Sequence, residues 1–422
     1  MREMKDSGIA WIGVIPQDWE IVRTKSLYCS AKEIAGDRAD DFARLALTLN
    51  GVIKRSKEDS VGLQPEKFSG YQILKKGELV FKLIDLENVA TSRVGLSPYT
   101  GIVSPAYIVL SKQSRAKDLV VRYSMYHFLS MWQREIFNQM GDNGVRSSLN
   151  AKELLNIPHP FPSIYEQKRI VTFLDAQCAE IDAVLEKTRA SIEEYKKLKQ
   201  AVITQAVTKG IRGDRPMKNS GIEWIGDIPA EWDVIRVKQL LKERNERSKE
   251  GKEEPLSMSQ KVGLVPTKFL ESIPNMASSF VGAKLAYVDD LVFNKLKAHL
   301  GVFSVSRYDG LVSPDYAVYC STGKSNLKYL EYIFKTPQCI GEFRKKSTGI
   351  AAGLMRLYTE GLFSIYLPYP ALSEQEEIAE YLNEKCAGID ALVAKKQQYL
   401  TEIENYKKSL IYEYVTGKKE VV

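Results

Sequence analysis

The sequence is poor in the residues that build metal centres, disulfide frameworks and membrane spans. Its 422 residues include only three histidines, His127, His159 and His299, which lie far apart and lack the spacing of metal ligands. The five cysteines are an odd number and form no Cys-x-x-Cys pair, a pattern typical of free thiols in a reducing compartment. No run of about 18 apolar residues predicts a membrane span, and the N-terminal sequence MREMKDSGIAW has no apolar signal-peptide core. We therefore expect a cytoplasmic protein without a metal site.

Catalytic signatures are also scarce. Gly323-Lys324-Ser325 resembles the end of a phosphate-binding P-loop, but Val318 stands where the first glycine of that motif belongs. Residues 313–316, Ser-Pro-Asp-Tyr, lack the second proline of the Asn/Asp-Pro-Pro-Tyr motif of adenine methyltransferases, and no glycine-rich cofactor loop precedes them. The sequence thus predicts a chain that is not an enzyme by itself, with no catalytic residues and no cofactor of its own.

What the sequence does contain is charge and core-forming residues. Lys and Arg number 60 and Asp and Glu 53, so the net charge is +7. Hydrophobic residues make up 44% of the chain, enough for packed globular cores, and its length suffices for two globular units and two long helices. The modest positive charge is compatible with a polyanionic partner but does not by itself indicate one.

The most regular stretch covers residues 166–207 and contains neither glycine nor proline. Its apolar residues recur at alternating steps of four and three, which is the heptad pattern of a helix that pairs with another helix. Such a helix would be a rod of roughly 60 Å, and the same pattern returns 208 residues later. The predicted seam of an antiparallel coiled coil consists of Leu174, Ile181, Leu185, Ile192 and Tyr195 and, in the second copy, Leu382, Ile389, Val393, Leu400 and Ile403.

A second internal repeat precedes each half of the chain. Residues 4–25 read MKDSGIAWIGVIPQDWEIVRTK, and residues 217–238 read MKNSGIEWIGDIPAEWDVIRVK. Both tryptophans, the Ser-Gly turn and the Ile-Pro pair recur, and we expect the tryptophans to be buried packing residues. Internal repeats of this kind define the architecture of a chain.

Two mixed segments follow these repeats with the same order of elements. Residues 77–82 predict a buried strand and 101–110 a turn into another strand, and 290–294 and 310–316 are their counterparts. Helical patterns follow at 120–140 and 327–346. The predicted fold class is α+β, with two tandem α/β-type domains (1–162 and 211–370) separated by two long helices (163–210 and 371–422). The arrangement would be pseudo-two-fold, and antiparallel helices would bring the C-terminus beside the N-terminus.

Together these motifs resemble the S (specificity) subunits of type I restriction-modification systems. The second half carries SGIEWIGDIPAEWDVIRVK, DLVFNKL, GLVSPDY and SEQEEIAEYLNEKCAGIDALVAKK, and the first half carries matching pieces in the same order. The resemblance implies two target recognition domains that each read one half of a bipartite DNA site. It also implies that the helices act as a spacer and dock two methyltransferase (M) subunits, and that restriction/motor (R) subunits join the complex. S-adenosylmethionine, ATP and Mg would then belong to the partner subunits.

Polar loops between the repeated strands are the expected DNA-reading surfaces, because Arg, Lys, Asn and Gln contact base edges and phosphates. The candidates in the first domain are Lys54, Arg55, Lys57, Lys82, Asn88, Arg93, Asn143 and Arg146. The candidates in the second domain are Lys261, Lys268, Asn294, Lys295, Lys297, His299, Lys345, Lys346 and Arg356. For any single one of them, a solvated surface charge is the simpler interpretation.

Outward-facing apolar residues on the predicted helices, Phe173, Leu198 and Tyr399, could receive helices of the M subunits. Two other functions are compatible with the sequence. The chain could be a non-catalytic coiled-coil adaptor whose globular ends bind proteins, or a fragment of a fused restriction-methyltransferase enzyme. Weak, sequence-independent DNA binding would favour the adaptor, and methylation by the purified chain alone would favour the fragment.

Overall fold

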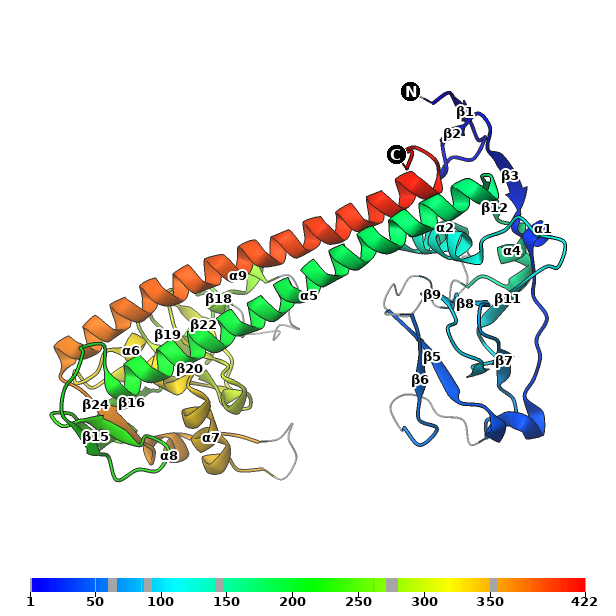
Figure 1. Cartoon of the computed structure of the whole chain (residues 1–422). Coiled ribbons are helices and arrows are strands. Elements are labelled where there is room, and N and C mark those ends of the chain that lie inside the picture. The colour runs from blue at the N-terminus through cyan, green and yellow to red at the C-terminus, as the bar shows by residue number, and fades with distance from the viewer. Residues whose placement is uncertain are drawn as a thin grey trace. The chain divides into compact units, whose positions relative to one another are not determined.

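The structure, a computed structural model, describes residues 2–49, 51–59, 67–84, 86, 93–140, 148–260, 262–270, 280–349 and 355–421. The chain divides into unit 1, Met1–Arg189 with Gln398–Val422, and unit 2, Ala190–Gln397. Each unit contains an α/β globule and segments of two long helices, α5 (Ile164–Lys209) and α9 (Leu372–Val415) (Figure 1). This combination of mixed globules with two long packed helices confirms the predicted fold class. Within the described ranges, no helix has both the length and the apolar content needed to cross a bilayer.

Segments of α5 and α9 run antiparallel in unit 1. Lys407 of α9 donates to Asp182 of α5 at 2.6 Å, and Arg189 of α5 donates to Glu404 of α9 at 2.5 Å. The residue numbers therefore rise along one helix while they fall along the other.

The same pairing recurs in unit 2. Lys199 of α5 donates to Asp390 of α9 at 2.6 Å, and the Lys396 ammonium lies 5.6 Å from the centroid of the Tyr195 ring. Lys199 and Asp390 are the repeat counterparts of Lys407 and Asp182, so the helix pair uses one ion pair twice with the partners exchanged. The seam positions of both helices are buried or half-buried: Leu174, Ile181, Leu185, Ile192, Tyr195, Leu382, Ile389, Val393, Leu400 and Ile403.

Two four-stranded sheets build the described part of the globule in unit 1. One has the order β6 (Gly51–Arg55), β5 (Arg44–Thr48), β10 (Gly101–Val103), β7 (Gln72–Leu74), and the other β4 (Tyr28–Cys29), β11 (Ile108–Lys112), β8 (Leu79–Lys82), β9 (Arg93–Leu96). The central strand β8 is buried on both faces: Leu79 and Phe81 pack into the core beneath the helices, while Val80 packs into the core between the sheets. Since successive side chains of a strand point to opposite faces, an uninterrupted apolar run is what such a strand requires.

The globule of unit 2 repeats this design. Its four-stranded sheet has the order β16 (Leu241–Arg244), β23 (Tyr316–Ser321), β20 (Leu291–Asn294), β21 (Phe303–Val305), and its described two-stranded pairs include β17 (Leu256–Ser259) with β18 (Gly263–Pro266) and β19 (Lys284–Ala286) with β22 (Gly310–Val312). Leu291 and Phe293 of β20 face one core and Val292 the other, as in β8.

Each predicted helical segment of the globules is two helices rather than one. In unit 1, α2 (Val121–Gln133) and α3 (Ile136–Met140) are separated by Glu135, whose φ of 57° cannot continue a right-handed helix. In unit 2, α6 (Leu327–Phe334) and α7 (Pro337–Lys346) are separated where the Thr336 side chain caps α7 and Pro337 occupies its first turn. The shorter helices α4 (Ala151–Asn156) and α8 (Thr359–Phe363) follow.

The proline-rich exits of the globules are short strands. β12 (Pro158–Phe161) pairs with β3 (Glu20–Arg23), and β24 (Tyr366–Tyr369) pairs with β15 (Asp233–Arg236). The N-terminal repeats also form the hairpins β1 (Met4–Asp6) with β2 (Val14–Pro16) and β13 (Met217–Asn219) with β14 (Asp227–Pro229). Each long helix therefore starts directly beside an N-terminal repeat.

A buried tryptophan fixes each of these junctions. The Trp19 indole N–H donates to Glu166 at 2.9 Å, and the Trp232 indole N–H donates to Glu374, also at 2.9 Å. Both glutamates belong to the first turn of a long helix. Trp19 and Trp232 are buried, which confirms their expected packing role, and their N–H groups are satisfied. The other tryptophan of each repeat, Trp11 and Trp224, is only half-buried.

An arginine and a glutamine complete each junction. Arg2 pairs with Glu166, and Arg215 pairs with Glu374 at 2.8 Å. The neighbouring Gln167 accepts a hydrogen bond from the Val120 backbone N–H at 2.8 Å, and Gln375 accepts one from the Asn326 backbone N–H at 3.0 Å. The repeated Glu-Gln pair thus joins each long helix both to the N-terminal repeat and to the start of a globule helix.

The C-terminal tail packs on the N-terminal repeat within unit 1. The Tyr412 hydroxyl donates to the Ile12 carbonyl at 3.1 Å, and the Lys418 ammonium donates to the Ile12 and Val14 carbonyls at 2.6 and 2.9 Å. The two ends of the chain therefore lie side by side (Figure 1).

Candidate nucleic-acid interface

In unit 2, the loop after β20 meets the Ser-Pro-Asp-Tyr turn. The backbone N–H of Lys295 donates to the Asp315 carbonyl at 3.3 Å, and its ammonium donates to the Pro314 carbonyl at 3.4 Å. Burial and then the nearby charge of Lys284 lower the pKa of the Lys295 ammonium. The nearby Asp315 and Glu243 carboxylates oppose this lowering, but among the described residues Lys295 forms no ion pair of its own, so its ammonium can contact an incoming anion.

Arg356 reaches the same turn from a distant part of the sequence. Its guanidinium lies 3.4 Å from the Asp315 carboxylate, and the backbone N–H of the next residue, Leu357, donates to the Lys295 carbonyl at 3.0 Å. Lys295, Asp315 and Arg356, here termed the Lys295 cluster, therefore converge from three segments. Two cationic donors and one carboxylate acceptor can contact phosphates, guanine edges and the cytosine amino group.

The other candidates of the second domain lie in different surroundings. Asn294 is half-buried and uses its side-chain oxygen to accept from the Leu296 N–H at 3.1 Å, while Lys297 is exposed. Lys345 pairs with Glu342 at 2.7 Å near the end of α7, and Lys346 is exposed beside it.

Two further candidates of this domain do not join the Lys295 cluster. His299 is only 7% exposed, because the 3-10 turn η4 (Ala298–Leu300) presents it to the protein interior, and its burial lowers its pKa. The assignment of His299 to a DNA-contacting surface is corrected accordingly. Lys268 pairs with Glu254 at 3.0 Å on the 3-10 turn η3 (Thr267–Phe269).

Unit 1 uses the same backbone framework with different side chains. The Leu149 N–H donates to the Leu83 carbonyl at 3.1 Å, which is the counterpart of the Leu357–Lys295 hydrogen bond. The residues in the three positions of the Lys295 cluster are Leu83, Ala106 and Ser148. The scaffold is therefore repeated while the chemistry it presents is not.

The cations predicted for the first domain fall into two groups. Lys54 lies on the edge strand β6, with its ammonium 4.9 Å from the centroid of the Tyr99 ring. Arg55 pairs with Asp59 at 2.6 Å, and Lys57 donates to the Ala39 carbonyl at 2.9 Å and pairs with Asp40 at 3.2 Å. These cations already have partners, so DNA contact would require exchange of those partners.

The second group lies where β8 and β9 pair. Lys82, half-buried at the end of β8, stands opposite Arg93 at the start of β9. Lys82 is the counterpart of Asn294, so this group and the Lys295 cluster follow corresponding strands. Four candidates, Asn88, Asn143, Arg146 and Lys261, lie outside the described residues.

Sequence reasoning missed Asp315 and Lys284. Asp315 belongs to the Ser-Pro-Asp-Tyr motif, which the sequence presents only as a turn before a strand. Lys284 is nearly buried in β19 and pairs with Glu243 at 3.3 Å, and its apolar sequence neighbours conceal its role. The available signal for Asp315 was the difference between the Ser-Pro-Ala-Tyr and Ser-Pro-Asp-Tyr motifs of the two repeats, where Ala106 corresponds to Asp315.

The apolar residues considered for partner docking also differ in exposure. Leu198 and Tyr399 are each 49% exposed. Phe173 is half-buried and packs on Tyr414, with ring centroids 4.4 Å apart, so its side chain faces outward only in part. The extra contact arises because α9 reaches the start of α5 within unit 1.

Comparison with known proteins finds relatives of one kind. Residues 16–194 match the family model described as the type I restriction modification DNA specificity domain. The type I restriction enzyme MjaVIII specificity subunit of Methanocaldococcus jannaschii is 23% identical over 429 residues, 96% of this chain and 94% of that protein. The provisionally assigned MjaX specificity subunit of the same organism is 25% identical over 432 residues, 97% of this chain and 96% of its own length.

Solved structures share the fold at lower identity. A chain from a study of complex assembly and conformational transition of the type I R-M system matches with a TM-score of 0.71 and 13% identity, and the match covers 96% of this chain and 99% of that one. The HsdS subunit from Thermoanaerobacter tengcongensis gives a TM-score of 0.50 and 15% identity over 96% of this chain and 98% of that one. These likenesses show a shared fold of two repeated α/β globules on paired long helices. Over nearly its whole length the chain is similar to the specificity subunits of type I restriction enzymes, and residues 16–194 match the DNA specificity domain.

Proposed function

We propose that this chain is the non-catalytic subunit that reads the DNA target of a type I restriction-modification complex. Each globule would read one half of a bipartite site, and α5 and α9 would act as the spacer. Helix α5 has 46 residues and is therefore about 69 Å long, close to two turns of B-DNA at about 34 Å per turn.

The observation that carries this proposal is a constant framework with variable side chains. The same backbone hydrogen bond closes the loop after β8 and after β20, at 3.1 and 3.0 Å. Over that framework, unit 2 presents Lys295, Asp315 and Arg356, and unit 1 presents uncharged residues. Two modules that read different half-sites need this combination, because base recognition depends on donors and acceptors held in a rigid geometry.

The partners follow from the same proposal. Two M subunits would dock on the helix pair, where Leu198 and Tyr399 offer exposed apolar surface, and R subunits would join for restriction. S-adenosylmethionine, ATP and Mg would be held by those partners.

The test is a genome-wide map of N6-methyladenine in cells that contain this chain and its own M subunit. A split motif that disappears when this chain is omitted is the expected result. Methylation that persists unchanged without the chain would contradict the proposal.

A double variant then tests whether the Lys295 cluster reads one half of the DNA site. Lys295→Leu with Arg356→Ser installs the unit 1 residues, and we expect it to relax or change one half of the motif only. Loss of one specific contact weakens binding by about 1–3 kcal/mol, so binding of the purified M–S complex to target duplexes should fall about 5- to 150-fold. Lys249→Ala removes an exposed cation elsewhere in unit 2 and should leave the motif unchanged. Equal effects of both variants would show a general charge effect instead.

The same experiments distinguish the coiled-coil adaptor. An adaptor would bind duplexes weakly and without preference for one sequence. Such behaviour of the complete M–S complex would place the adaptor function first.

A further inference from the structure

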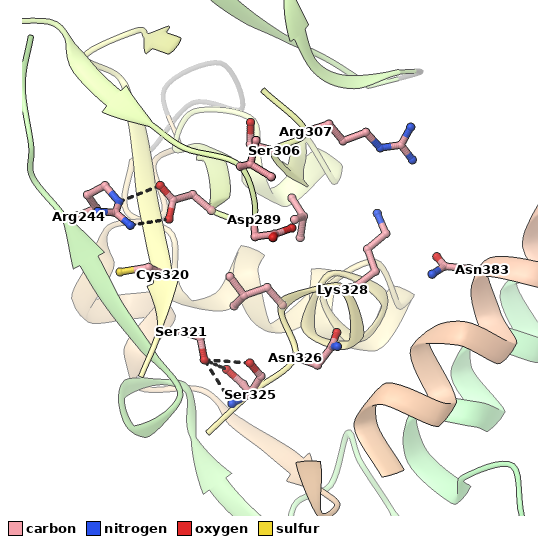
Figure 2. Close-up of a pocket in the computed structure, with 14 residues that line it drawn as sticks. Arg244, Asp289, Ser306, Arg307, Cys320, Ser321, Ser325, Asn326, Lys328 and Asn383 are labelled. Carbon is pink, nitrogen blue, oxygen red and sulfur yellow. Dashed lines mark hydrogen bonds and ion pairs between the residues drawn. The ribbon is translucent and has the colours of Figure 1, made fainter. Parts of the chain in front are cut away.

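A cavity of about 800 Å³ with a mixed polar and apolar lining lies in unit 2, and none of its lining residues belongs to the Lys295 cluster. Its wall combines residues 288–290 and 305–307, the segment 320–328, Arg244 of β16 and Asn383 of α9 (Figure 2). A concave site of this volume matches the size of common small-molecule pockets, about 300–1,000 Å³.

One side of the cavity is closed by an internal ion pair. Arg244 donates twice to Asp290, at 2.8 and 3.1 Å, and the Asp290 carboxylate also accepts from the Tyr287 N–H at 2.9 Å. Asp290 is 2% exposed. These groups satisfy one another and form a rigid wall.

The opposite side presents side-chain N–H donors from three elements. Figure 2 shows the side chains of Arg307, Lys328 and Asn383 turned toward a common opening. Asn383 accepts from the Tyr332 hydroxyl at 2.8 Å through its oxygen, which leaves its NH₂ group as a donor. Arg307 is exposed, and among the described residues it forms no ion pair.

The local charge at this opening is positive. Lys328 pairs with the buried Glu331 at 2.7 Å, and Lys335 pairs with the same carboxylate at 2.5 Å. One negative charge is thus shared by two ammonium groups, and Arg307 adds a third cation. Cationic N–H donors arranged around one opening favour a phosphate, because charge-assisted hydrogen bonds are about twice as strong as neutral ones.

Unit 1 has other residues in these positions. Pro98 occupies the place of Arg307, and Lys112 occupies that of Ser321. The Lys112 ammonium donates to the Leu119 carbonyl at 2.6 Å, so its long side chain spans the region that Ser321 leaves open in unit 2. The arrangement of donors is therefore a property of unit 2.

Asp289 adds an acceptor to the same cavity. Its φ of 67° lies in the left-handed region, and its counterpart in unit 1 is Gly77 with a φ of 88°. Aspartate tolerates this region less easily than glycine, so the substitution accepts some backbone strain to bring a carboxylate to the cavity wall.

We infer that this cavity binds a small phosphorylated molecule that also carries hydroxyl groups, of the nucleotide or sugar-phosphate class. The phosphate lies between Arg307, Lys328 and Asn383, and the Asp289 carboxylate accepts from a hydroxyl group. This inference does not rest on the DNA-reading function, because binding of a small ligand is measurable on the full chain without DNA.

Calorimetric titration of the full chain with adenosine monophosphate and with inorganic phosphate tests the assignment. Both probes should bind, and Arg307→Ala should weaken both by about tenfold or more, as expected for a lost charge-assisted hydrogen bond. Lys249→Ala removes an exposed cation outside the cavity and should change neither affinity. Absence of binding to the wild-type chain, or an equal loss in both variants, overturns the inference.

The variant Asp289→Gly distinguishes the hydroxyl contact of the ligand from its phosphate contact. The variant carries the unit 1 residue, and glycine suits the left-handed backbone, so the fold is retained. We expect weaker binding of adenosine monophosphate with unchanged binding of phosphate. A DNA duplex provides the second source of phosphate: if it displaces adenosine monophosphate from the wild-type chain, the site holds a backbone phosphate and the small-molecule assignment is wrong.

Discussion

A pair of buried histidines should make unit 1 sensitive to mild acid. His127 and His159 lie with ring centroids 4.5 Å apart, and each is 1% exposed or less. The His159 ring donates from Nδ1 to the Pro160 carbonyl at 2.7 Å and accepts at Nε2 from the Ser124 hydroxyl at 2.9 Å. Aromatic rings, including that of Trp11, cover the His127 ring. These surroundings stabilise neutral imidazoles, and within the described ranges no charged group contacts either ring.

The size of the stability loss in acid follows from the lowered pKa values of the two histidines. Burial lowers the pKa of His159 from 6.5 to about 4 and that of His127 well below its usual value. Because the unfolded chain takes up the protons first, the stabilisation is complete above pH 6.5 and is lost as the pH falls toward 4. The shift of His159 alone corresponds to about 3 kcal/mol at pH 4 and about 2 kcal/mol at pH 5. His127 adds to the loss with the same sign.

Unit 2 supplies the control for this prediction. Ile333 and Leu367 occupy the positions of His127 and His159, and both are fully buried. His127→Ile with His159→Leu therefore installs side chains that the repeated fold already accommodates. In urea unfolding, the wild-type chain should lose at least about 2 kcal/mol more than this variant between pH 7.5 and pH 5. Equal losses, or imidazole protons that titrate near pH 6.5 in NMR spectra of the folded chain, would refute the reasoning.

Two predictions concern the helix junctions and the helix pair. Glu374→Ala leaves the buried Trp232 N–H unpaired, and we expect it to lower the free energy of unfolding by about 3 kcal/mol in urea titrations. The control is Glu376→Ala on the exposed face of the same turn, which should change the free energy of unfolding by less than about 0.5 kcal/mol. Lys199→Asp should lower the free energy of unfolding by less than about 1 kcal/mol, because the Lys199 and Asp390 side chains are 32% and 61% exposed. Adding Asp390→Lys should restore the lost stability in thermal unfolding. A large loss that the second change does not restore would indicate a packing role for Lys199.

The sequence predicts best those helices and strands whose apolar residues follow a regular local pattern. Heptads of apolar residues identify α5 and α9, and apolar runs without polar interruption identify β8 and β20 as strands buried on both faces. In both cases the apolar pattern shows which faces of the helix or strand are buried, and the pattern lies entirely within the sequence of that element.

Features that depend on distant contacts were not predictable in the same way. The Glu-Gln pair at the start of each long helix is visible in the sequence, but Glu166 receives its hydrogen bond from Trp19, 147 residues away. Likewise, His299 follows a polar loop that suggests exposure, yet its side chain is buried where η4 packs against α7. No window of sequence contains the partner that decides either case.

The comparison between the two halves shows where this chain can vary. At the junctions, the Trp–Glu hydrogen bond has the same length of 2.9 Å in both units, and the Gln–backbone contacts recur within 0.2 Å, at 2.8 and 3.0 Å. At the loops after β8 and β20 only the backbone hydrogen bond recurs, while the side chains change from uncharged to charged. Stability therefore depends on side chains that both copies retain. In the proposed function, recognition depends on the side chains that differ, and these are held by a backbone that both copies share. Under the proposed function, a substitution in the Lys295 cluster should alter DNA preference with little effect on folding, which is the physical condition for one scaffold to read different sequences.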